Sequence, residues 1–195
     1  LIFAQEQGDV FRHGKLKNGL TYYVRHSKTT PRHADFYLVQ NVGALLEEDN
    51  QNGLAHFLEH MAFNGSESFK EGIPRFLNRR GIKQFNAMTG QDETIYHINY
   101  VPVSDQSLVD SCLLVLKDWS GFLLLNPVEI DKERGVIFEE RRSRRDVNTR
   151  IREQVDPYVF NHSRYATRDV IGTVEVLSNF TPEELRAYYH DFYRP

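Results

Sequence analysis

"GLAHFLEHMAFNG", residues 53–65, combines the apolar residues of a buried helix with two histidines and a glutamate. Residues four apart in a helix lie one turn apart on the same face, so the imidazoles of His56 and His60 can converge on one ion. Glu59 lies about 60° around the helix from His56, beside such an ion without having to bind it. The alternative is an amphipathic helix whose polar face happens to carry these three residues.

A catalytic zinc site fits this pattern best. Zinc accepts neutral imidazole nitrogens at about 2.0–2.1 Å and tolerates a carboxylate as a further protein ligand. The order H-x-x-E-H is the inverse of the commoner zinc-protease order and defines its own class of sites. Its glutamate stands where a general base for the hydrolytic water is needed. The stretch therefore predicts a metal site with its base, and a third ligand elsewhere in the chain.

Carboxylates that could supply the third ligand are crowded in "DKERGVIFEERRSRRD", residues 131–146. On a helical wheel, Ile130 and Ile137 share a face that we expect to point to the core. Glu133 and Glu140 are seven residues apart and lie about 60–80° to one side of that face, whereas Glu139 falls opposite, toward solvent. The spacing leaves two interpretations open: a pair at the edge of a site, or an exposed flank paired with the neighbouring lysine and arginines.

The composition is typical of a globular domain with a well-developed core, because hydrophobic residues make up 40% and charged residues 26% of 195 residues. The net charge of −3 gives no overall basic field for nucleic acid, and we interpret "RRSRR" (141–145) as a charged helix face. Cys112 is the single cysteine, so it cannot form an internal disulfide, and we expect a small buried hydrophobe there.

Two features of the sequence bear on localisation. No stretch approaches the roughly 18 consecutive apolar residues that a membrane span needs, so we expect no span. "LIFAQ", residues 1–5, is similar to the end of a signal peptide, where an apolar run precedes a small residue. We therefore predict a signal-peptide remnant at residues 1–5 and export to a bacterial periplasm or cell envelope.

The remaining patterns predict short strands joined by hairpins, with helices between them. Asn18-Gly19 indicates a tight hairpin within residues 15–26. The other expected strands are residues 34–43, 82–89 and 93–101. The expected helices are the histidine helix, one from Pro74 to near Gly81, one over 104–124, one from near Pro127 into the 150s, and one over 182–192. These elements predict an α+β domain, an antiparallel sheet with helices packed on one face.

Five segments, in this order, resemble the pitrilysin/insulinase family of zinc metallopeptidases, the inverzincins. They are "LKNGLTYYV", "GLAHFLEHMAFNGS", "FNAMTGQDETIYHINYVP", "ERGVIFEE" and "TPEELRAYYHDFYRP". The resemblance implies an α+β domain similar to that of the mitochondrial processing peptidase. It also implies zinc-dependent hydrolysis of peptide bonds, as an endopeptidase or oligopeptidase, with one Zn²⁺ per chain.

Roles for single residues follow from the same resemblance. It implies that His56 and His60 bind zinc and that Glu59 acts as the general base. The family places its third ligand seven residues after another glutamate, so Glu140 is the implied ligand. Glu133 is then the acid that supports the site from behind its ligands.

The resemblance also implies how substrate binds. "FNA" matches the family's edge strand, where Asn86 and Ala87 would hold a peptide substrate in extended form by strand addition. Without the resemblance, a strand-end residue that satisfies its own turn is the preferred interpretation of Asn86.

Members of this family are much longer than this chain. We therefore expect residues 6–195 to be an N-terminal zinc peptidase domain truncated from a longer multi-domain protein. C-terminal domains or a partner subunit would complete the catalytic chamber, so we expect the isolated chain to be weakly active at best.

A non-catalytic scaffold or peptide-binding subunit of the same fold is the alternative function. Such relatives typically lose residues of the motif, whereas both histidines, Glu59 and Glu140 are present here. A purely structural zinc site is disfavoured, because such sites usually have four ligands rich in cysteine.

Overall fold

A three-stranded antiparallel sheet with strand order β3-β5-β4 forms the centre of the fold. The fold is given by a computed structural model that describes residues 11–194. The strands are β3 (His33–Gln40), β4 (Gln84–Thr89) and β5 (Thr94–Pro102). In β3, Leu38 and Gln40 are buried while Tyr37 and Val39 are half-exposed, so one face of the sheet packs on the core and the other faces solvent.

Both hairpins predicted from the sequence are present. β1 (Phe11–Lys15) and β2 (Thr21–Arg25) pair as a separate two-stranded antiparallel sheet. Gly19 has a φ of 100°, which glycine adopts without strain, at the turn between these strands. In the second hairpin Thr89 pairs with Thr94, and the Gly90 amide donates to the Glu93 carbonyl at 2.8 Å to close the turn between β4 and β5.

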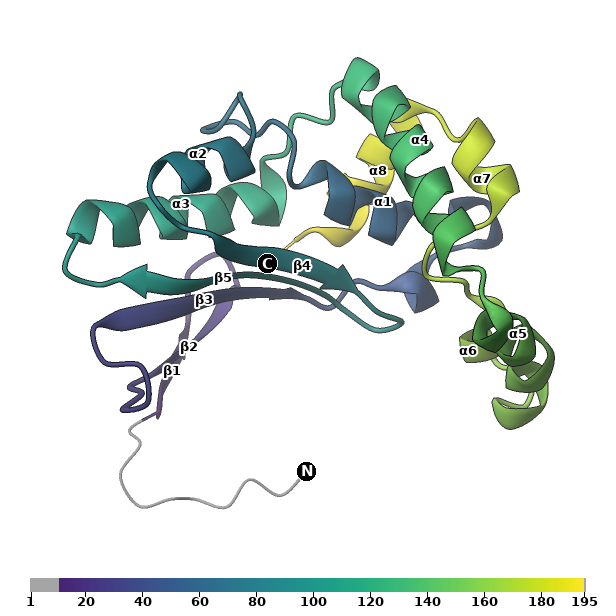
Figure 1. Ribbon diagram of the computed structural model, residues 1–195, viewed down its shortest axis with the longest axis horizontal. Coiled ribbons are helices and arrows are strands. Elements are labelled where there is room, and N and C mark those ends of the chain that lie inside the picture. Colours follow the sequence, from purple (N-terminus) through teal and green to yellow (C-terminus); the bar gives the residue numbers. More distant parts are fainter. Residues whose placement is uncertain (1–10, 195) are drawn as a thin grey trace.

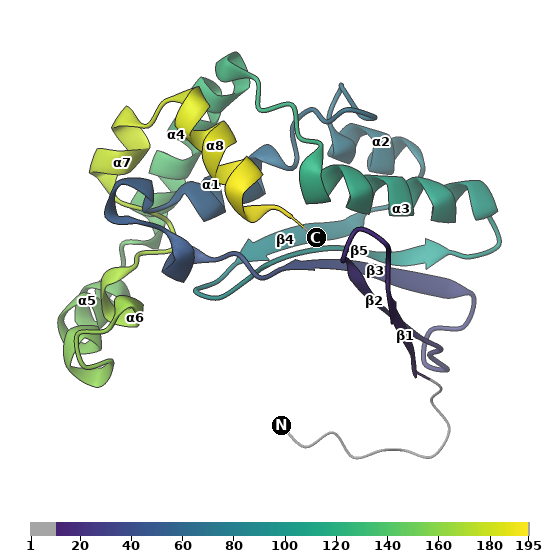
Figure 2. The same ribbon diagram turned by 180° about the vertical axis from the view of Figure 1, so that it is seen from behind.

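Helices cover the buried face of the three-stranded sheet. Both views place α1, α2, α3 and α8 on the same side of it (Figures 1 and 2). This confirms the predicted arrangement of antiparallel strands and helices. The helices are α1 (Leu54–Met61), α2 (Ile73–Arg79), α3 (Gln106–Gly121), α4 (Pro127–Arg144), α5 (Val147–Val159), α6 (Arg164–Thr167), α7 (Val174–Asn179) and α8 (Pro182–Phe192), with short 3₁₀ turns η1 (Ala44–Leu46) and η2 (Asp49–Gln51).

Aromatic packing joins the sheet to the helical layer. Tyr96 of β5 stacks on Trp119 of α3 with ring centroids 5.2 Å apart, and both side chains are fully buried. The Trp119 indole N–H donates to the carbonyl of Ala62, just after α1, at 2.9 Å. The interaction fixes the end of the histidine helix against α3 and the sheet.

The prediction of one unbroken helix from near Pro127 into the 150s is wrong, because the structure has two separate helices there. α4 ends at Arg144 and α5 begins at Val147. Asp146 lies between them and accepts a hydrogen bond from the Thr149 amide at 2.8 Å, so its side chain caps a new helix instead of continuing the old one. As a result α5 and α6 lie together at one end of the molecule (Figure 1).

Three further predictions concern the final helix, residues 1–5 and Cys112. The final helix has the predicted bounds, and Thr181 and Glu184 form its capping box. The proposed signal-peptide remnant at residues 1–5 lies outside the described residues. Cys112 is fully buried, as expected of a small hydrophobe.

Candidate metal centre

Helix α1 holds the histidines rigidly because most of its surface is buried. Leu54, Phe57, Leu58 and Met61 are at most 1% exposed. At its N-terminus Gly53 has a φ of 106° and offers no capping side chain. The carboxylate of Glu47 caps the helix instead, accepting the backbone amides of Gly53 and Ala55, each at 2.9 Å.

His56, His60 and Glu140 come together across the gap between α1 and α4. The Oε2 atom of Glu140 lies 3.6 Å from His56 Nε2 and 3.1 Å from His60 Nε2. One ligand atom from each of the three residues lies within 4.8 Å of the others. The packing of α1 against α4 thus brings Glu140 next to the two histidines, although it is far from them in the sequence.

These residues fit a zinc ion. Two ligands about 2.0–2.1 Å from a tetrahedral zinc lie roughly 3.3 Å apart, close to the separations between the Glu140 oxygen and the imidazole nitrogens. Within residues 11–194, Glu140 Oε2 is buried without a hydrogen-bond partner. A buried carboxylate oxygen without a donor is costly unless a cation or proton satisfies it.

The protonation of His56 also suits a metal ligand. Burial, with the nearby charges of His60 and Arg144, lowers the pKa of His56 to about 3. The imidazole is therefore neutral at pH 7, which is the form that binds a metal ion.

Glu133 lies behind His60 rather than in the cluster itself. Its Oε1 is 2.8 Å from His60 Nδ1, so a proton on Nδ1 is shared with Glu133 while Nε2 faces Glu140. Burial alone would lower the pKa of His60, but the hydrogen bond and charge of Glu133, with the charges of Glu140 and Glu59, raise it overall. This arrangement is typical of the carboxylates that orient histidine ligands.

Glu59 lies on the same helix and is 9% exposed. The hydroxyl of Thr89, the last residue of β4, donates to Glu59 Oε2 at 2.7 Å. Burial raises the pKa of Glu59, while the Thr89 hydrogen bond opposes the rise. A carboxylate whose pKa is moved toward neutrality is suited to take up and release a proton.

The helical wheel correctly predicted which residues of α4 are buried and which are exposed. Ile130 and Ile137 are fully buried, and the Glu139 side chain is 69% exposed. Glu140 turns its second oxygen, Oε1, toward Arg144, with which it forms an ion pair. Arg144 therefore occupies one carboxylate oxygen and leaves the other facing the histidines.

Asn86 and Ala87 lie in the middle of β4, one of the two outer strands of the three-stranded sheet. Asn86 is exposed and Ala87 is buried. The structure brings their strand to the cluster through Thr89, but the Asn86 side chain makes no hydrogen bond among the described residues.

Three residues near the cluster were missed from the sequence. Glu47 belongs to "EEDNQN", which only marked a break between a strand and a helix, and nothing local distinguishes it from Glu48. Thr89 lies one residue before the turn that follows β4. Arg144 lies four residues after Glu140. The second spacing is a helical ion-pair signal that could have been found.

The fold is a mixed α/β domain of antiparallel sheets and helices that matches solved structures of peptidases. The chain belongs to the insulinase family, Peptidase family M16, whose family model matches residues 22–170. The relatives are named as zinc proteases, which implies zinc as the metal.

Two relatives have similar sequences over almost the whole chain. "Probable zinc protease PqqL" of Haemophilus influenzae is 35% identical over 94% of this chain, and that of Escherichia coli is 32% identical over 93%. The chain spans about a fifth of the length of each relative, 20% in both cases.

Solved structures show the same fold. The crystal structure of the periplasmic protease PqqL from Escherichia coli superposes with a TM-score of 0.90 at 30% identity, covering 99% of this chain and 21% of that one. The crystal structure of the ferredoxin protease FusC in complex with Arabidopsis ferredoxin superposes with a TM-score of 0.88 at 30% identity, covering 96% of this chain and 21% of that one. Pitrilysin, at 20% identity and a TM-score of 0.78, shares the fold.

Within residues 11–194 no helix combines the length and the apolar character that crossing a membrane requires.

Proposed function

We propose that this chain is the zinc-binding, peptide-hydrolysing domain of a metalloendopeptidase or oligopeptidase. His56, His60 and Glu140 would hold one zinc ion per chain, and Glu59 would act as the general base. The observation that carries the proposal is the convergence of the three ligand atoms within 4.8 Å, with Glu59 on the same helix as the two histidines. The zinc-protease relatives support it.

The three ligands would leave the fourth position of a tetrahedral ion open, as catalytic sites require. When bound, zinc supplies Lewis acidity, which polarises a carbonyl group and lowers the pKa of water. Glu133 would keep the imidazole of His60 oriented through the 2.8 Å contact at Nδ1.

Glu59 would move the proton. Thr89 donates to Oε2 of Glu59, so Oε1 is left to take a proton from the attacking water. The same oxygen would then give that proton to the leaving amine as the peptide bond breaks, which returns Glu59 to its carboxylate form. Partial burial keeps this carboxylate from being fully solvated and therefore keeps it basic.

The substrate would be a peptide in extended form, added as a strand beside β4. β4 has a free edge in the described sheet, and Asn86 and Ala87 lie on it. Its last residue contacts Glu59, so a peptide along this edge would pass the general base.

Residues 6–195 would form the zinc domain of a longer protein, because the chain spans 20% of its PqqL relatives. Further domains or a partner subunit would complete the chamber and raise the activity. The Escherichia coli relative is described as periplasmic, which supports export to the periplasm or cell envelope, with residues 1–5 as the end of a signal peptide.

Hydrolysis in ¹⁸O-labelled water tests the proposal even where turnover is slow. We expect the zinc-loaded chain to cleave a peptide mixture weakly, with ¹⁸O in the new carboxyl termini, and we expect Glu59→Gln or a chelator to stop it. Cleavage that persists in Glu59→Gln would contradict the role of Glu59. A zinc-loaded full-length protein with no cleavage at all would favour the non-catalytic scaffold.

A further inference from the structure

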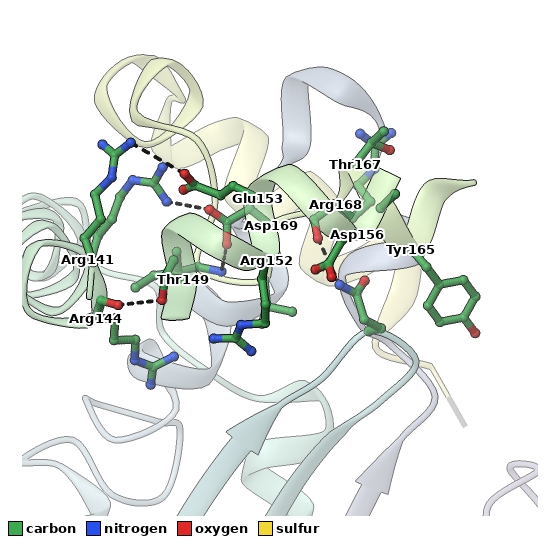
Figure 3. Close-up of a pocket in the computed structure, with 15 residues that line it drawn as sticks. Arg141, Arg144, Thr149, Arg152, Glu153, Asp156, Tyr165, Thr167, Arg168 and Asp169 are labelled. Carbon is green, nitrogen blue, oxygen red and sulfur yellow. Dashed lines mark hydrogen bonds and ion pairs between the residues drawn. The ribbon is translucent and has the colours of Figure 1, made fainter. Parts of the chain in front are cut away.

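A pocket rich in arginine lies where α4, α5 and the segment after α6 meet (Figure 3). Its volume is about 350 Å³. We call it the arginine pocket, and its basic residues are Arg141, Arg144, Arg145, Arg152 and Arg168. Its acidic residues are Glu153, Asp156 and Asp169. Two of these arginines pair with acids outside the lining: Arg144 with Glu140, and Arg168 with Asp49 at 2.7 Å.

The acidic residues neutralise only some of the arginines. Arg141 pairs with Asp169 at 2.5 Å, and Arg145 lies 3.8 Å from Glu153. Arg152 has no hydrogen bond or ion pair with any residue in the described part of the chain. Figure 3 shows the side chains of Arg144 and Arg152 pointing to the same side of the pocket. An anion entering there would meet the guanidinium of Arg152, which has no acidic partner among the described residues, beside that of Arg144, which pairs with Glu140.

The pocket adjoins the candidate metal centre. Arg144 pairs with Glu140, one of the three clustered residues. Gln91, another lining residue, lies in the turn after β4, two residues beyond Thr89, whose hydroxyl contacts Glu59. β4 runs toward the end of the molecule that holds α5 and α6 (Figure 1). A peptide that lies along β4 and passes Glu59 would therefore continue into the arginine pocket.

We propose that the arginine pocket is a subsite for a carboxylate of the peptide substrate, and that it makes the chain prefer acidic peptides. The inference rests on the proposed peptide hydrolysis and names a substrate class for it. The guanidinium fork binds a carboxylate through two parallel hydrogen bonds, and the unpaired charge of Arg152 suits one such group.

Either an aspartate or glutamate side chain or the free carboxyl terminus of a peptide can supply this group. The two sources are separated by peptides that differ in one group only. One series is amidated at the C-terminus and carries Glu, Gln or Lys at each position in turn. A second series has no acidic side chain and ends in either a free acid or an amide.

Binding is measured by fluorescence anisotropy with an uncharged dye, on the zinc-loaded chain carrying Glu59→Gln so that no peptide is cleaved. We expect the acidic peptide of one series to bind about three- to tenfold more tightly than its neutral partner, and the Lys peptide to bind most weakly. The series that shows the difference identifies the source of the carboxylate. Added salt should reduce the difference.

Arg152→Gln should remove most of this preference. Arg150→Gln is the matched control, because Arg150 is an exposed arginine of the same helix that does not line the pocket, and it should keep the preference. Arg152→Glu should reverse the order and favour the Lys peptide.

Equal affinity for acidic, neutral and basic peptides would overturn the proposed subsite. An equal loss of the preference for acidic peptides in Arg150→Gln and Arg152→Gln would also overturn it. Zinc content and neutral-peptide binding, measured on the same samples, separate the two levels of failure. If both persist while the preference is absent, only the subsite is wrong. If neither zinc nor any peptide binds, the proposed function falls together with the subsite.

Discussion

The Nδ1 atom of His60 lies 2.8 Å from Oε1 of Glu133, while Nε2 of the same ring lies 3.1 Å from Oε2 of Glu140. One imidazole thus links two glutamates that are seven residues apart on α4. The two acids have different surroundings: Glu140 faces both histidines, and Glu133 faces only the far side of one ring.

Glu133 should therefore tune zinc affinity without being needed for the site to form. We expect Glu133→Gln, which keeps an acceptor but loses the charge, to weaken zinc binding about tenfold, and Glu133→Ala to weaken it up to about a hundredfold. Competition with a chromophoric chelator measures both. If Glu133→Ala bound zinc as tightly as the unaltered chain, the supporting role would be excluded.

Arg144 should hold Glu140 in the orientation that leaves Oε2 free. We expect Arg144→Gln to weaken zinc binding several-fold, since an ion pair at a partly exposed site contributes about 0.2–1 kcal/mol. Arg142→Gln is the control, because Arg142 pairs with the exposed Glu139 on the same helix, and it should leave zinc affinity unchanged. Equal effects of the two variants would show that only general charge matters.

Thr89 should keep the pKa of Glu59 from rising further. The Thr89 hydroxyl donates to the ionised carboxylate and so favours it, which means that Thr89→Val should raise the pKa of Glu59. Carboxyl ¹³C NMR titration of the zinc-free chain measures this, with Thr21→Val on the exposed β2 as a control. A pKa that is unchanged or lower in Thr89→Val would contradict the contact.

Glu47 should make the zinc-free fold less stable as the pH rises. Burial raises the pKa of Glu47 to about 7 from its ordinary value of 4.5, against the opposing hydrogen bonds from Ala55 and Gly53. Between these values the unfolded chain releases a proton that the folded chain keeps, so the free energy of unfolding falls as pH rises from 4.5 to 7 and is level beyond. The difference between these two pKa values corresponds to a fall of about 3 kcal/mol in the free energy of unfolding.

Urea denaturation at pH 5 and pH 8, with chelator present, measures this change. Glu47→Gln cannot ionise, so its free energy of unfolding should lack this part of the decrease, whatever its stability at either pH. A variant with the same pH dependence as the unaltered chain would show that Glu47 is ionised throughout.

Much of the site could be predicted from the sequence because it is written in local spacing. His56, Glu59 and His60 share one helix, and the wheel correctly separated Glu139 from Glu133 and Glu140. The wheel could not rank the last two, because the difference between them depends on the crossing of α4 over α1, a tertiary contact. The resemblance to a family, rather than the spacing, assigned Glu140 as the ligand.

The break between α4 and α5 was missed for a local reason. The charged run through Arg145 has good helix propensity, and it concealed the capping signal of Asp146 followed by Thr149. The arginine pocket depends on this break, because α5 would otherwise continue along the axis of α4.

Zinc content of the purified chain tests the central claim most directly. The account predicts near one zinc ion per chain by elemental analysis, with loss of zinc in Glu140→Gln and His60→Ala and retention in Glu59→Gln. A chain that is folded by circular dichroism but takes up no zinc after metal loading would contradict it, as would a Glu140→Gln variant that keeps its full zinc content.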